Sequence, residues 1–163
     1  MKTSILITII ICLLGFKANG QSSFEAFTHP EANIHQNVSI YHSPNSYYME
    51  MSSDNEAGWI VRVHERQGNF FRIDIEDLNM YNVWIHCGDL GVVIQNYDHA
   101  DIPLLSSIFK ADCDTVFLTH SYSAIVYDFV DQYVFVRIGD TNEIVYGWIE
   151  KKYLCGSPYT TCP

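Results

Sequence analysis

Short runs of alternating apolar and polar residues fill the chain from Asn37 onward. The runs are rich in Val, Ile, Tyr and Phe and are broken by Gly, Asn and Asp, which is typical of β-strands separated by turns. No stretch keeps an amphipathic helical pattern over three turns. The sequence therefore predicts an all-β protein, in which residues 21–36, which show no period, form a leader or a short edge segment.

The strand-rich region resembles itself at a separation of 63 or 64 residues. Three blocks recur in the same order: residues 40–43 with 103–106, 70–75 with 133–138, and Trp84-Ile85 with Trp148-Ile149. This order predicts two copies of one small β unit. The alternative is that two β-rich halves look alike because strand patterns are generic.

We expect the first copy at residues 37–97 and the second at 102–163, joined by a polar linker at 98–101. A unit of this size is marginally stable alone, so the copies should pack against each other.

Alternation assigns a face to each residue of the repeated strand. The residues expected to point inward are Phe71, Ile73 and Ile75 in the first copy and Val134, Val136 and Ile138 in the second. Phe70 and Tyr133 occupy the same outward position, so both copies place a partly exposed aromatic ring there. Such a ring is consistent with ligand binding and equally with packing under a loop.

The first 20 residues have the three parts of a secretory signal peptide. Lys2 is followed by an apolar run from Ile5 to Phe16, and Ala18 and Gly20 supply the small residues before a cut. The run is too short to span a membrane, for which about 20 residues are needed. We therefore expect residues 1–20 to be removed, leaving an exported chain, periplasmic or secreted, without a membrane anchor.

Charge narrows the set of partners. Nine Lys and Arg stand against 19 Asp and Glu, a net charge of -10, and removal of Lys2 and Lys17 leaves 7 against 19, or -12. Nucleic-acid binders neutralise phosphates with basic side chains, so this balance argues against nucleic acid. The expected partners are peptides, cell-wall components or proteins.

Four cysteines remain after residue 20, an even number, which in an exported chain favours disulfides. Three pairings are conceivable. The turn-rich loop between Cys155 and Cys162 favours a local bridge there, which leaves Cys87 to pair with Cys113. The spacings match no zinc motif.

No catalytic or metal-binding constellation is evident in the sequence. The seven histidines show no metal-ligand spacing, His86 and Cys87 are adjacent and so point to opposite faces of a strand, and no nucleotide-binding or nucleophile motif is present. We therefore expect a protein that is not an enzyme and that uses no cofactor and no metal.

Residues 147–154 read Gly-Trp-Ile-Glu-Lys-Lys-Tyr-Leu, which resembles the closing motif of bacterial SH3-like (SH3b) domains, and residues 131–136 resemble the strand that precedes it. The first copy carries the same pieces in degraded form. The tail from Cys155 to Cys162 is similar to tails of small exported SH3b proteins of the Bacteroidetes type. The resemblance covers about residues 37–162 and implies two tandem small SH3-like barrels.

The resemblance implies the function of this family, which is non-catalytic binding of short peptides, including cell-wall peptides, in an aromatic groove. Carried over residue by residue, the groove residues are Tyr133, Trp148 and Tyr153 in the second copy and Phe70 and Trp84 in the first. The first copy departs from the motif, since Asp89 replaces the groove Tyr and Val83 the Gly, so it is a candidate for packing alone. Glu150 replaces the Pro of eukaryotic SH3 domains, which argues against proline-rich ligands.

Two hypotheses follow. The first is an exported tandem SH3-like protein that binds a peptide or cell-wall (peptidoglycan peptide) ligand. The second is a periplasmic protein-protein device, namely an inhibitor, immunity factor or assembly subunit, whose acidic surface binds a basic partner.

Overall fold

A computed structural model of the chain describes residues 22–28, 37–52, 58–96, 100–139 and 143–156. The predicted signal peptide, residues 98 and 99 of the predicted linker, and Cys162 lie outside these ranges. Within them, no helix is long and apolar enough to cross a membrane.

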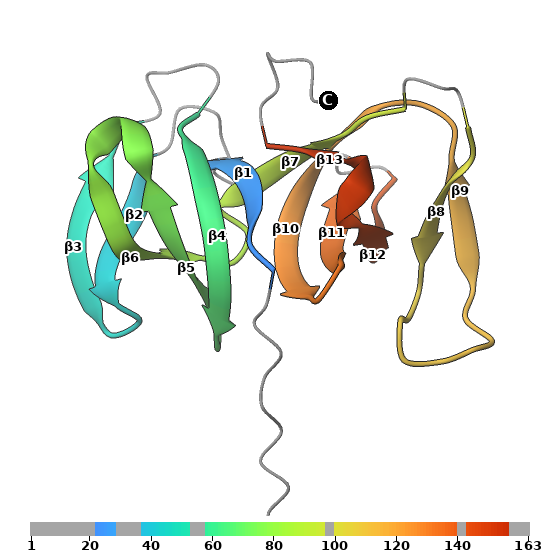
Figure 1. Cartoon of the computed structure of the whole chain (residues 1–163), viewed down its shortest axis with the longest axis horizontal. Helices are drawn as coiled ribbons and strands as arrows, with labels where there is room; N and C mark the ends of the chain where they lie inside the picture. The colour runs from blue at the N-terminus through green and yellow to red at the C-terminus, as the bar shows by residue number, and fades with distance from the viewer. Residues whose placement is uncertain (1–21, 29–36, 53–57, 97–99, 140–142, 157–163) are drawn as a thin grey trace, which may run out of the picture.

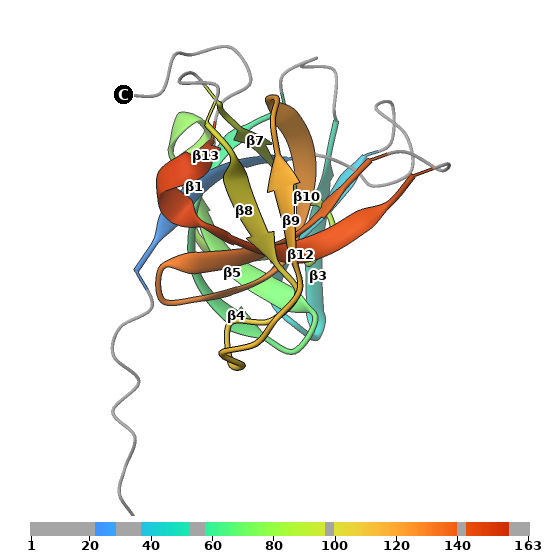
Figure 2. The same cartoon turned by 90° about the vertical axis from the view of Figure 1, so that its right-hand side faces the viewer.

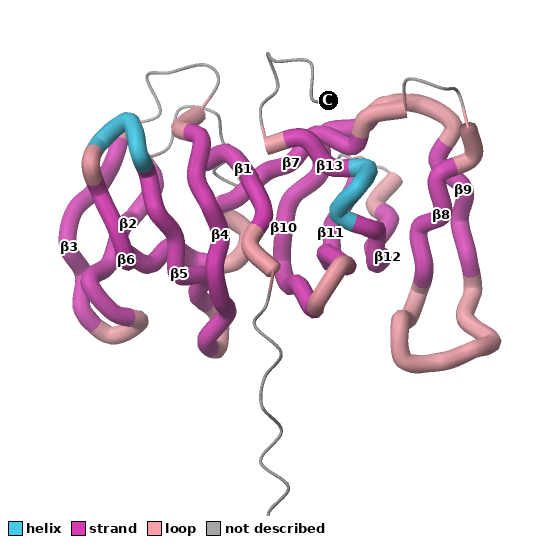
Figure 3. Tube along the Cα trace, in the orientation of Figure 1, coloured by secondary structure: helices cyan, strands magenta, loops and turns pink. Residues whose placement is uncertain are grey.

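The described residues form thirteen strands and two 3-10 turns (Figures 1 and 3). In chain order these are β1 Phe24–Thr28, β2 Val38–Ser43, β3 Ser46–Met51, β4 Ile60–Gln67, β5 Phe70–Ile75, η1 Glu76–Leu78, β6 Met80–His86, β7 Leu90–Ile94, β8 Ile102–Leu105, β9 Thr115–Leu118, β10 Tyr122–Val130, β11 Tyr133–Ile138, β12 Val145–Glu150, η2 Lys151–Tyr153 and β13 Leu154–Cys155. The all-β prediction is confirmed.

The strands pair in one continuous antiparallel path, β3-β2-β6-β5-β4-β1-β7-β10-β11-β12-β8-β9, and β13 also pairs with β7. The path is open and ends at β3 and at β9. In Figure 1 the strands β2 to β6 lie on one side and β10 to β12 on the other, while β8 and β9 form an outlying hairpin that Figure 2 views from its own side.

The two sides of the path repeat each other, with β7 common to both. We call β1 to β6 the first half and β8 to β13 the second half. In the first half β1 pairs with β4 and β7, and in the second half β7 takes the place of β1 and pairs with β10 and β13. Ala26 lies opposite Val61 as Val92 lies opposite Ala124, so the two registers correspond.

Smaller features repeat as well. The pairing slips between Val63 and Glu65 in β4 and between Val126 and Asp128 in β10, which places a β-bulge at the same point of both halves. The turns that follow contain a residue with positive φ at the same position, Gly68 with φ 60° and then Asp131 with φ 48°. Correspondence at this level is more than two generic β-rich halves would show.

The pairing corrects one part of the predicted alignment. Tyr41 lies opposite Trp84, and Leu105 lies opposite Trp148, so Tyr41 corresponds to Leu105 at 64 residues. The expected match of residues 40–43 with 103–106 is therefore displaced by one residue. Burial agrees with the corrected alignment, because Ile40 and its equivalent Leu104 are both buried.

Residues 24–28 do not behave as a leader. They form β1, which is hydrogen-bonded on both sides and contributes Phe24, Ala26 and Phe27 to the core. The predicted start of the first copy at residue 37 thus leaves out a central strand.

One hydrophobic core runs through both halves. The inward residues expected from alternation are all buried, and β5 and β11 show the same alternating burial pattern. Phe129 of the second half has no exposed surface, and its ring centroid lies 5.2 Å from that of Phe24 and 5.9 Å from that of Phe71. The halves are therefore joined by packing as well as by strand pairing.

Candidate functional site

The outward face of β11 and β12 carries a row of aromatic rings. Phe135 lies opposite Trp148 in the ladder, and alternation places Tyr146 on the same face of β12. The ring centroid of Phe135 lies 5.2 Å from that of Trp148 and 6.2 Å from that of Tyr146. The planes of the Phe135 and Tyr146 rings are nearly parallel, with an angle of 20° between them.

Two further rings extend this row. Phe109, between β8 and β9, meets Trp148 edge-on with centroids 6.3 Å apart, and Tyr127 lies 6.2 Å from Tyr146. We call Phe109, Tyr127, Phe135, Tyr146 and Trp148 the aromatic face. Phe109 is 76% exposed and Tyr146 is 51% exposed, while Trp148 is 9% exposed. The face thus combines a fixed indole with rings that a ligand can reach.

Of the residues predicted for the second groove, Trp148 belongs to the aromatic face. Tyr133 begins β11 opposite Glu150, and Tyr153 lies in η2, partly buried against the core. The Nζ of Lys152 is 4.8 Å from the Tyr153 ring centroid. Among the described residues, the rings in contact with Trp148 are those of Phe109 and Phe135, rather than Tyr133 or Tyr153.

In the first half, Phe70 and Trp84 lie on the corresponding face. The Phe70 ring contacts Tyr41 at 5.0 Å and His86 at 4.1 Å, whereas Trp84 is 8% exposed. Arg72 stands at the position of Phe135, and its side chain is held by Glu65 at 2.9 Å and by the Asn82 oxygen at 2.6 Å. In the first half an ion pair therefore stands where the second half has the central ring of the aromatic face.

A cleft of about 430 Å³ lies where the two halves meet. Its walls are formed by side chains of both halves: Arg66, Asn69, His86 and Cys87 from the first, and Tyr127, Asp128 and Phe135 from the second. Arg66 Nη1 is 2.5 Å from Asp128 Oδ2, which makes this ion pair a direct link across the cleft. Sequence reasoning missed this site because its members lie far apart in the chain.

Cys87 and Cys113 are free in the structure, so the expected bridge between them is not formed. Cys87 follows β6 in the cleft, whereas Cys113 precedes β9 in the outlying hairpin. Burial raises the pKa of the Cys87 thiol to about 11, although the charge of Arg66 acts in the opposite direction. The thiol is therefore protonated at neutral pH. The bridge between Cys155 and Cys162 stays a prediction.

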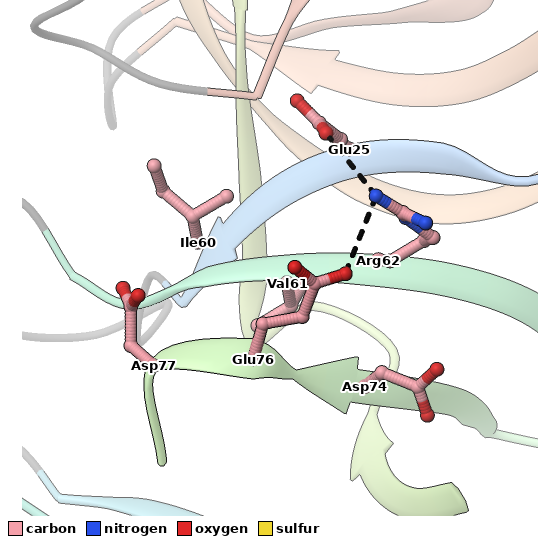
Figure 4. Close-up of a pocket in the computed structure, with 7 residues that line it drawn as sticks. All are labelled: Glu25, Ile60, Val61, Arg62, Asp74, Glu76 and Asp77. Atoms are coloured by element: carbon pink, nitrogen blue, oxygen red, sulfur yellow. Dashed lines mark ion pairs between the residues drawn. The ribbon is translucent and has the colours of Figure 1, made fainter. Parts of the chain in front are cut away.

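A smaller pocket of about 130 Å³ is strongly acidic. Glu25, Asp74, Glu76 and Asp77 line it together with Arg62, whose Nη2 lies 3.3 Å from Glu76 and 3.9 Å from Glu25 (Figure 4). Both Glu side chains and Arg62 are largely exposed, so these ion pairs are weak. The pocket lining contains four carboxylates and one guanidinium, which leaves an excess of negative charge here.

No group of three or more His, Cys, Asp or Glu side chains in the described ranges is arranged to hold a metal ion.

No protein-family model matches the chain. No curated protein matches it either. Among solved structures, NlpC2 from Trichomonas vaginalis is similar over 83% of this chain and 48% of its own, with 16% identity and a TM-score of 0.33. NlpC1 from the same organism is similar over 83% of this chain and 46% of its own, with 18% identity and a TM-score of 0.32. The chain thus spans about half the length of each, and its functional assignment depends on its own geometry.

Proposed function

We propose that the chain is a non-enzymatic binding protein of tandem SH3-like units that recognises a short peptide, such as a cell-wall peptide, outside the cytoplasm. The aromatic face of the second half is the observation that carries this proposal. A row of adjacent rings, partly exposed and anchored by a buried indole, offers a large apolar surface at low entropic cost.

The two halves have different roles in this proposal. The second half binds, because Phe135 completes its row of rings. The first half packs, because Arg72 with its ion pair occupies the equivalent position.

The test is a titration with purified cell-wall peptides, followed by Trp fluorescence. Phe109→Ala should weaken binding about tenfold, since it removes an exposed ring that contacts Trp148. Tyr81→Ala, an exposed ring of β6 in the first half, is the matched control and should leave binding unchanged. If wild-type protein gives no saturable signal, or if Phe109→Ala binds as well as wild type, the proposal is wrong.

A second function is favoured by the acidic pocket of Figure 4, namely capping of a basic protein. Such binding would weaken steeply with salt, whereas contacts on aromatic rings would change little. Repeating any observed binding at low and high ionic strength separates the two functions. The double variant Glu76→Gln, Asp77→Asn should affect only the salt-sensitive mode.

A further inference from the structure

The cleft between the halves presents two opposite charges side by side. Arg66 is at the end of β4 and Asp128 follows the bulge of β10, and their ion pair spans the cleft. Their side chains are 34% and 26% exposed, so both remain within reach of a ligand. Bulges commonly aim a side chain at a binding site, which suits the position of Asp128.

The rest of the wall is neutral or aromatic. The Cys87 thiol is protonated, and the His86 ring is held against Phe70 at 4.1 Å. Tyr127 and Phe135 face the cleft from the second half. The faces of such rings attract ammonium groups, and they lie beside the carboxylate of Asp128.

These features select one class of ligand. A simple anion would be attracted by Arg66 but repelled by the carboxylate of Asp128. A simple cation would be attracted by Asp128 but repelled by Arg66. A molecule that carries both a carboxylate and an ammonium group satisfies both side chains after their own pair opens. The volume of about 430 Å³ falls within the range of small-molecule sites, which often lie between structural units.

We propose that this cleft binds a small zwitterion, an amino acid or a dipeptide, with its carboxylate on Arg66 and its ammonium group on Asp128. The planar guanidinium can donate two parallel hydrogen bonds to a carboxylate. Asp128 accepts from the ammonium group, which Tyr127 and Phe135 flank. This site is distinct from peptide binding on the aromatic face, although Tyr127 and Phe135 belong to both.

Calorimetric titration of the full chain with alanyl-alanine tests the proposal. Two blocked probes are compared: N-acetyl-alanyl-alanine, which lacks the ammonium group, and alanyl-alanine amide, which lacks the carboxylate. Each should bind about tenfold or more weakly than the zwitterion, because each leaves one charged side chain of the cleft without its ligand partner.

Variants of Arg66 and Asp128 show which side chain binds the carboxylate end of the ligand and which binds the ammonium end. Arg66→Gln should lower the affinity for alanyl-alanine to that of the amide, and Asp128→Asn should lower it to that of the acetylated form. Arg62→Gln is the matched control, since Arg62 lies on the same strand but pairs with Glu76 outside the cleft, and it should bind as wild type does. Thermal unfolding of each variant confirms that it is folded.

The proposal fails if wild type shows no saturable binding of alanyl-alanine, or if the blocked probes bind equally well. It also fails if folded Arg66→Gln and Asp128→Asn both retain wild-type affinity. Loss of peptide binding in Phe109→Ala, with alanyl-alanine binding intact, would show that the two sites are distinct.

Discussion

Cys87 and Lys151 occupy equivalent positions in the two halves and make the same backbone contact. The N–H of Cys87 donates to the Asn69 carbonyl at 2.8 Å, and that of Lys151 donates to the Gln132 carbonyl at 2.7 Å. Their side chains differ in surroundings, since Cys87 faces the cleft and Lys151 lies over the rings of Phe24 and Phe129. The repeat thus fixes the backbone, while the side chains at its equivalent positions have diverged.

Lys151 should make stability increase with pH in the alkaline range. Burial lowers the pKa of its ammonium group from 10.5 to about 8, although Asp131 acts in the opposite direction. Between pH 8 and 10.5 the unfolded chain therefore binds more protons, so the contribution of Lys151 to the free energy of unfolding grows as pH rises. The free energy of unfolding of wild type minus that of Lys151→Met should therefore increase across this window. Urea denaturation of both proteins measures it.

Lys110→Met is the control for this experiment, because Lys110 is exposed. Its difference from wild type should stay constant with pH. A constant difference for Lys151→Met as well would contradict the prediction. Lys151 Nζ also contacts the backbone oxygen of Ser22 and lies 3.1 Å from its hydroxyl, so the variant should loosen the start of β1 as well.

The Cys87 thiol should react slowly with thiol reagents in the folded protein at neutral pH. The thiolate is the nucleophile, and a pKa of about 11 leaves very little of it. In a Cys113→Ser background, the rate of modification should rise about tenfold per pH unit below this pKa. Absorbance assays with a disulfide reagent measure it, and the urea-unfolded chain supplies the reference rate. Reaction of native protein at the unfolded rate at pH 7 would contradict the prediction.

The sequence predicts strand faces well and predicts the site only in part. Alternation identifies Phe71 and Val136 as core residues because the strand period acts locally. It cannot identify β1, whose short sequence becomes a strand by pairing with the distant β4 and β7. Nor does it place Tyr127 on the aromatic face, since the bulge beside Val126 interrupts the alternation on which a face assignment depends.

Asp74 should contribute to stability above the acid range. Burial raises the pKa of its carboxyl, but hydrogen bonds from the Asn82 N–H and from His64, with the charges of His64 and Arg72, outweigh burial and leave the pKa below 3.8. His64 Nε2 lies 2.7 Å from Asp74 Oδ2. Because the folded pKa is depressed, this stabilisation is present above about pH 4 and is lost as pH falls through the folded value.

Asp74→Asn should therefore be less stable than wild type at neutral pH, and the difference should shrink on acidification. Urea denaturation at a series of pH values down to about 3 measures it. Asp112→Asn, a change at an exposed carboxylate, should show no such convergence. Equal stability of Asp74→Asn and wild type at pH 7 would rule out the stabilising role.

Gly147 should be intolerant of alanine because β12 and β8 approach closely there. A Cβ at this position would lie 2.5 Å from Leu104 Cγ and 3.0 Å from the Leu105 carbonyl oxygen. The backbone oxygen cannot move freely, so the outlying hairpin must shift away from β12, and overpacking of this kind costs about 1–3 kcal/mol.

Gly68→Ala is the matched control: its Cβ would meet nothing within 4 Å, and its cost is limited to about 1 kcal/mol for the positive φ. Urea denaturation compares the two, and because the shift moves Phe109 relative to Trp148, Gly147→Ala should also change the near-UV circular dichroism. A Gly147→Ala variant as stable as Gly68→Ala, with an unchanged spectrum, would show that the hairpin is not held by this contact.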